Sequence, residues 1–89
     1  MPIKPSNVIY HELIGLEAEV VASPDPAEVG LRGVVVWETA NLLILDTSGG
    51  RRRIPKRGRV FRLILPSGSR VRVLGSLMVG RPEERVKRI

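Results

Sequence analysis

The residues with the strongest chemical character in this 89-residue chain are arginines and lysines, which crowd its second half. Residues 51–89 carry 13 basic side chains against two acidic ones, a net charge of +11, whereas residues 1–50 carry a net charge of −5. Arginine presents a planar fork of donors that suits phosphate and can stack on bases. So dense a basic half predicts binding to a polyanion, with solubility or a compositional bias as the alternative.

Side chains that usually perform catalysis are scarce in this sequence. The chain has no cysteine and a single histidine, His11, so a zinc site of the usual kind cannot be built. Asp25 and Glu28 share a proline-containing loop, where a solvated turn is favoured over metal binding. Ser76 has no neighbouring base in the pattern that would activate it. We therefore expect no catalytic residue, no metal ligand and no cofactor in this chain.

The basic residues point instead to nucleic acid. The predicted RNA-binding residues are Lys4, Arg51, Arg52, Arg53, Lys56, Arg57, Arg59, Arg70, Arg72, Arg81, Arg85, Lys87 and Arg88. Only three aromatic residues are present, and Trp37 and Phe61 lie in apolar alternation that favours the core over base stacking. We therefore expect recognition of the backbone and shape of a folded RNA.

Apolar residues at a spacing of two predict the elements that position these side chains. Strands are expected at residues 16–22, 31–38, 42–47, 51–54, 60–65 and 70–74, and residues 77–79 are expected to close a barrel. A short helix is expected from Ser6 to Gly15, and Pro82 is placed to start a basic C-terminal helix. The pattern predicts an all-β fold, a small closed or nearly closed barrel of five to six antiparallel strands.

The acidic first half should turn away from phosphate and face a protein partner. The predicted partner-binding residues are Val8, Ile9, Tyr10, Leu13, Glu17, Glu19 and Glu38. A helix of two turns is not stable alone in water, so its apolar side must be covered. The alternative is that this helix simply plugs the end of its own barrel.

Several runs of the sequence resemble the family of archaeal ribonuclease P protein component 1, which is shared with eukaryotic ribonuclease P/MRP. The matching runs are residues 5–8, 11–16, 33–35, 38–44, 54–56, 65–68 and, above all, 75–85, with Phe61. The sequence departs from the family pattern at Trp37, where a polar residue is common, and at residues 51–53, where arginines replace a mixed acidic and lysine turn.

This resemblance implies a strongly bent, Sm-like barrel with short terminal helices. It implies a subunit of a ribonucleoprotein whose RNA is the catalyst, uses Mg²⁺ and removes the 5′ leader of precursor tRNA. The expected partners are ribonuclease P RNA and a small zinc-ribbon protein subunit, with precursor tRNA met indirectly and no membrane. The isolated chain is expected to be a monomer or heterodimer in the cytoplasm.

The expected organisation is one RNA-binding domain over residues 1–89. It comprises a helical segment at 1–15, the barrel at 16–79 and a basic helix at 80–89. Two other functions remain open on the sequence alone. One is a general Sm-like or ribosomal-type RNA-binding module outside a cleavage complex, and the other is an adaptor whose basic half meets an acidic protein.

Overall fold

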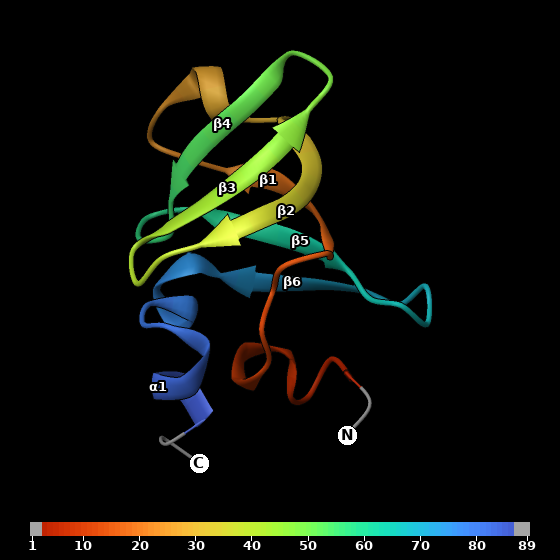
Figure 1. Ribbon diagram of the computed structural model, residues 1–89. Helices are drawn as coiled ribbons and strands as arrows, with labels where there is room; N and C mark the ends of the chain where they lie inside the picture. The colour runs from red at the N-terminus through yellow and green to blue at the C-terminus, as the bar shows by residue number, and fades with distance from the viewer. Residues whose placement is uncertain (1–2, 87–89) are drawn as a thin grey trace.

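The computed structural model describes residues 3–86, most of which form one strongly bent antiparallel sheet of six strands (Figure 1). The strands are β1 (Glu17–Ala22), β2 (Arg32–Glu38), β3 (Leu42–Thr47), β4 (Gly50–Pro55), β5 (Val60–Ile64) and β6 (Arg70–Leu74). Their order across the sheet is β4-β3-β2-β1-β5-β6, so β4 and β6 are its two edges. The prediction of an all-β fold with five to six antiparallel strands and only short helices is confirmed.

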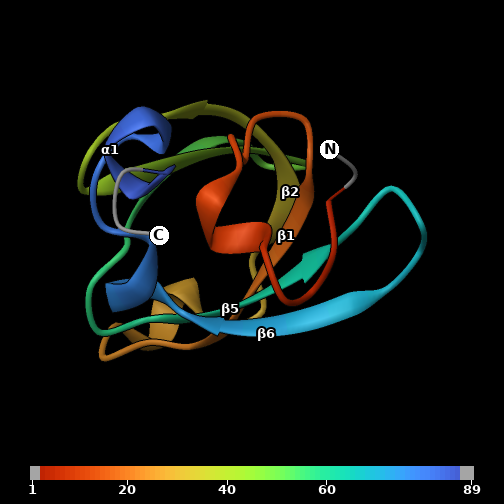
Figure 2. The ribbon, with the colours of Figure 1, turned by 90° about the horizontal axis from the view of Figure 1, so that it is seen from below.

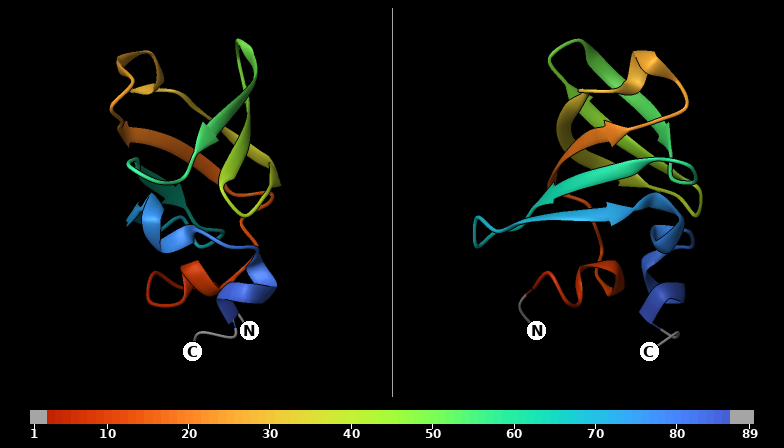
Figure 3. Two further views of the ribbon diagram at one scale, coloured as in Figure 1. Left: turned by 90° about the vertical axis from the view of Figure 1, so that its left-hand side faces the viewer. Right: turned by 180° about the vertical axis from the view of Figure 1, so that it is seen from behind.

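Tight turns limit the length of the strands. The β3–β4 hairpin turns at Gly50 with φ 108°, and the loop between β5 and β6 turns at Gly68 with φ 90°, values that favour glycine. The β5–β6 hairpin projects from the body of the molecule, as Figure 1 and the right-hand view of Figure 3 show. The helical elements are η1 (Val8–Tyr10), η2 (Pro26–Glu28), η3 (Gly75–Met78) and α1 (Pro82–Val86).

Strand β2 contains a bulge that changes which side chains face the core. Val35 lies opposite Leu45 of β3, and Trp37 lies opposite Ile44, which is adjacent to Leu45. Val36 therefore has no partner on β3 and is an extra residue. Trp37 therefore points outward and is 59% exposed, whereas Glu38 is 6% exposed. The prediction that Trp37 is a core residue is wrong, because regular alternation does not run through the bulge.

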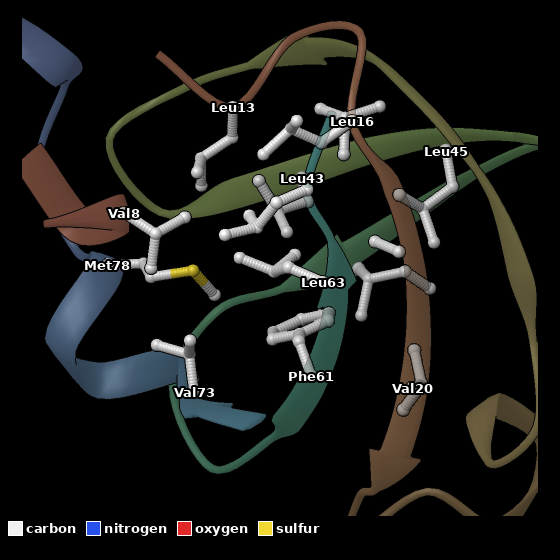
Figure 4. Packing of buried hydrophobic residues seen from close by; sticks show 14 residues of the cluster. Val8, Leu13, Leu16, Val20, Leu43, Leu45, Phe61, Leu63, Val73 and Met78 are labelled. Carbon is white, nitrogen blue, oxygen red and sulfur yellow. The ribbon is translucent and has the colours of Figure 1, made fainter. Parts of the chain in front are cut away.

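The core lies in the concavity of the bent sheet. Phe61 and Leu63 of β5 meet Leu43 and Leu45 of β3 there, all fully buried (Figure 4). The prediction that Phe61 is a core residue is confirmed. Fourteen buried apolar side chains join this single cluster. Burial of that many apolar groups supplies the main driving force for folding.

Both terminal segments lie under the same end of the sheet. Figure 2 views that end directly, with the N-terminal segment and α1 lying across it. Val8 and Leu13 are buried in the core, and Met78 of η3 packs beside Val8 (Figure 4). The expectation that Val8 and Leu13 face a partner is therefore wrong: the N-terminal segment plugs its own barrel. Only η1 is helical within residues 6–15. Residues 77–79 were expected to close the barrel, but they form no strand, and residues 77 and 78 belong to the 3-10 turn η3.

Gly75 sits where the chain leaves β6 and passes close to the turn after β4. Its N–H donates to the Arg59 carbonyl at 2.7 Å. A Cβ at this position would run into the backbone carbonyl of Lys56 and would lie 3.0 Å from the Arg59 carbonyl oxygen. A backbone neighbour cannot swing aside as a flexible side chain can.

Substitution Gly75→Ala is therefore expected to lower the free energy of unfolding by about 1–3 kcal/mol, the usual cost of overpacking. Urea denaturation followed by circular dichroism measures this loss. Ser76→Ala, at the exposed next residue, is the control and should change stability by no more than about 0.5 kcal/mol. Equal stability of the two variants would show that the contact at Gly75 relaxes freely.

Candidate nucleic-acid interface

The exposed cations of the predicted interface lie mostly on the two edge strands. The exposed members of the predicted set within residues 3–86 are Lys4, Arg51, Arg52, Arg53, Arg57, Arg70, Arg72 and Arg81. Three consecutive arginines belong to β4, and two alternate on β6. Lys87 and Arg88 lie outside the described residues.

Neighbouring strands carry cross-strand charge pairs at the centre of the sheet. Arg62 of β5 donates to Glu19 of β1 at 3.1 Å, and Arg32 of β2 donates to Glu17 of β1 at 2.8 Å. The carboxylates of Glu17 and Glu19 thus neutralise the central arginines, and Glu17 also raises the pKa of Arg32. These two glutamates were expected to meet a protein partner, and their charges are already engaged within the sheet.

By contrast, the arginines of the edge strands have no ion-pair partner within residues 3–86. Arg72 lies directly opposite another cation, Arg62. Arg51 lies opposite Asp46 but forms no ion pair with it. Unpaired, exposed guanidinium groups keep their full donor capacity for an external anion. The free positive charge of the sheet is therefore concentrated at β4 and β6.

Arg59, another predicted RNA contact, is used inside the molecule. Its Nε donates to Glu28 Oε1 at 2.8 Å, and the hydroxyl of Ser23 donates to the same carboxylate at 2.7 Å. The hydrogen bond from Arg59, more than any other contact, holds the pKa of Glu28 below its usual range. The same pair raises the pKa of Arg59. This pair joins the turn after β4 to η2, so Arg59 is a structural residue.

The lowered pKa of Glu28 predicts a dependence of stability on pH. Its pKa is lower in the folded chain than in the unfolded chain, so the pair stabilises fully above about pH 4.5 and progressively less as pH falls through the folded pKa. The melting temperature of wild type should exceed that of Glu28→Gln at pH 7, and the difference should shrink toward pH 3. A difference that stays constant over this range would contradict the assignment.

A second group of predicted site residues forms a buried ionic cluster of Glu38, Lys56 and Arg85. Glu38 Oε2 accepts hydrogen bonds from Lys56 Nζ at 2.8 Å and from an Arg85 nitrogen at 2.7 Å. Glu38 Oε1 accepts from the backbone N–H of Leu13 at 3.3 Å. The three side chains have at most 1% of their surface exposed, so water does not screen these contacts.

Backbone carbonyls complete this buried ionic cluster. Arg85 donates to the carbonyls of Ile9, His11, Met78 and Gly80, the last two at 3.1 and 2.6 Å. Lys56 donates to the carbonyls of Thr39 at 2.8 Å and Gly80 at 3.1 Å. Burial lowers the pKa of Lys56, and its bond to Glu38 opposes this shift. Within residues 3–86 no buried side-chain nitrogen or oxygen lacks a hydrogen-bond partner.

These contacts correct three predictions made from charge alone. Lys56 and Arg85 were expected to meet RNA and Glu38 a protein, but all three are turned inward. The physical reason is that one carboxylate compensates two cations and is placed in the core by the β2 bulge. The cluster joins β2, the turn after β4, the N-terminal segment and α1. Its role is therefore to stabilise the fold.

Trp37 is an exposed residue that the sequence pattern had assigned to the core. It borders a hollow lined also by Val36, Ile44, Arg51 and Arg53. Tyr10 and Ile9, by comparison, are half-buried beside the terminal segments. Only the departure of Trp37 from the polar residue common at its position in the family pattern hinted that this side chain was unusual.

Within residues 3–86, no three His, Asp or Glu side chains come together as a metal site. None of the helices in this part of the chain is long and apolar enough to cross a membrane.

Comparison with known proteins identifies the family that shares these features. The family model "Ribonuclease P/MRP, subunit p29" matches residues 6–88. "Ribonuclease P protein component 1" of Thermofilum pendens is 47% identical over 89 residues, which cover 99% of this chain and 95% of the relative. The protein of the same name from Methanocaldococcus jannaschii is 46% identical over 87 residues, covering 97% and 90% of the two chains.

A solved structure agrees with the sequence comparisons. It is a homologue of a human RNase P protein, and it superposes with a TM-score of 0.61 at 39% identity. The match covers 84% of this chain and 97% of that one. The bent six-stranded sheet and the match over residues 6–88 lead to one conclusion: this chain belongs to the ribonuclease P/MRP subunit p29 family.

Proposed function

We propose that this chain binds and stabilises the RNA of ribonuclease P through the unpaired arginines of β4 and β6. Membership in the family makes it a protein subunit of a ribonucleoprotein that works in tRNA processing. The observation that carries the proposal is the division of charge within one sheet. Central arginines are neutralised by Glu17 and Glu19, whereas the edge arginines stay free.

The chain supports catalysis without performing it. Guanidinium groups at the edge strands neutralise phosphates, which lowers the repulsion between RNA segments that must pack together. The RNA supplies the active site and uses Mg²⁺ to cleave the 5′ leader of precursor tRNA. Protein cations then reduce the Mg²⁺ concentration at which the RNA reaches its active shape.

We further propose that a small zinc-ribbon subunit of the same enzyme docks beside the terminal segments, in the cytoplasm. The buried ionic cluster and the core hold these segments in place. The segments therefore present an ordered surface before a partner binds. Half-buried Ile9 and Tyr10 and exposed Leu77 supply apolar area there. A heterodimer formed at this end leaves the arginines of β4 free for RNA.

Reconstitution of precursor tRNA cleavage tests the proposed function. Ribonuclease P RNA is assayed at limiting Mg²⁺ with its other protein subunits, with and without this chain. We expect the chain to increase the cleavage rate and to lower the Mg²⁺ concentration needed. Binding of many unrelated RNAs without any effect on cleavage would favour a general RNA-binding module. Absence of RNA binding would favour an adaptor.

A further inference from the structure

Trp37 is a large apolar side chain that the fold leaves in solvent. It is the only tryptophan of the chain and is 59% exposed. The bulge at Val36 sets it on the outer face of β2, outside the cluster of buried core residues. Bulges that re-aim a side chain are common beside functional sites.

The neighbours of Trp37 are apolar on one strand and cationic on the next. Across the sheet, Trp37 lies opposite Ile44 of β3, which lies opposite Arg53 of β4. Arg51, two residues along β4, lines the same hollow. Neither arginine has an ion-pair partner within the described part of the chain.

This combination suits a nucleotide better than a protein side chain. An indole face stacks on any base, and a flanking guanidinium binds the phosphate attached to it. The residues that line this hollow include two cations and no acid. On its other side Trp37 borders a hollow lined by Glu12, Glu83 and Arg81, whose mixed charge gives no comparable preference for an anion.

We propose that Trp37, Ile44, Arg51 and Arg53 form a binding site for one unpaired nucleotide of an RNA. The base stacks on the indole beside Ile44, and the two guanidinium groups take the flanking phosphates. A base within a duplex is already stacked on both faces, so the site selects a loop, bulge or single strand. This inference rests on the proposed function, because it adds a base contact to the proposed phosphate contacts.

Intrinsic fluorescence tests the proposal directly, because Trp37 is the sole tryptophan. Wild-type protein is titrated with a single-stranded RNA oligonucleotide, with a duplex of the same sequence and with an abasic oligonucleotide of equal length. We expect the single strand to quench the emission through stacking. The abasic oligonucleotide should bind the arginines with little quenching, and the duplex should also quench little.

Variants then measure what the ring contributes to affinity, using a labelled oligonucleotide. Trp37→Leu should weaken binding of the single strand about fivefold to a hundredfold, the usual range for one stacked base. Trp37→Phe keeps an aromatic face and should retain most of the affinity. Leu74→Ala removes another exposed apolar side chain, 55% exposed on β6, and should bind as wild type does.

The outcomes separate this inference from the proposed function. If the single strand binds wild type but quenches no more than the abasic oligonucleotide, and Trp37→Leu binds equally well, the nucleotide site is refuted and RNA binding stands. If no RNA binds, the proposed function fails as well. A Trp37→Leu variant that binds RNA normally but loses the protein subunit in reconstitution would assign Trp37 to a protein interface and overturn the inference.

Discussion

Glu38→Gln is expected to lower the free energy of unfolding by about 3–5 kcal/mol, the usual cost of leaving buried charges without their partner. Its carboxylate compensates both Lys56 and Arg85, and neither cation has another anion in the cluster. With a neutral amide at position 38, two buried cations repel each other. Urea denaturation followed by circular dichroism measures the loss, and a chain too unstable to fold at 25 °C meets the same expectation.

The matched control is Glu17→Gln, on the adjacent strand. Glu17 also pairs with an arginine, Arg32 at 2.8 Å, but both side chains are well exposed, at 41% and 62%. A solvated pair of this kind stabilises by at most about 1 kcal/mol. Similar losses for the two variants would refute the special role of the buried ionic cluster.

Hydrogen exchange gives a second, local measure of the same cluster. Glu38 accepts from the Leu13 amide, and Arg85 binds the carbonyls of Ile9 and His11, so the cluster holds both terminal segments. In Arg85→Met the amide of Leu13 should lose protection, whereas amides in the centre of β1 and β5 should lose less. Uniform loss across the sheet would indicate global destabilisation alone.

Replacement of Arg51, Arg52 and Arg53 by glutamine is expected to weaken binding to ribonuclease P RNA about a hundredfold near 0.1 M salt. Each phosphate contact contributes about 0.7–0.9 to the slope of log affinity against log salt, so losing three should reduce it by about 2 to 3. Stability should change little, because these side chains are exposed and unpaired within the described residues. Binding is measured across a series of salt concentrations.

The control removes arginines that already have a partner. Arg32→Gln/Arg62→Gln takes two cations from β2 and β5, where Glu17 and Glu19 neutralise them. Its effect on the salt slope, per arginine removed, should be much smaller than that of the β4 variant. Equal effects per arginine would mean that RNA affinity depends on the net charge of the chain and not on the unpaired arginines of the edge strand β4.

Much of this protein was predictable from the residues alone. Alternating apolar residues and glycine-containing turns indicated five or six short strands, since both are local properties of the chain. The position of Phe61 in the core followed from the same alternation. The gathering of basic residues after position 50 pointed to an RNA-binding protein.

Two of the errors have the same cause in β2. Regular alternation places Trp37 with Val35 on the core face and Glu38 on the outer face. The single extra residue at Val36 reverses this for both side chains, so an expected core residue became a surface residue and an expected partner contact became the centre of a buried ionic cluster. A bulge depends on pairing with β3 and leaves no distinct local signal.

Tertiary structure likewise determined which charged side chains are buried in ion pairs and which are exposed. Sequence composition determined that this chain is basic, all-β and suited to a polyanion, because these follow from residue types and their spacing. It could not distinguish Arg85, which is buried against Glu38, from Arg53, which is free on β4, since their partners come from segments far apart in the chain. Only the fold decides which cations meet a carboxylate and which stay exposed without one.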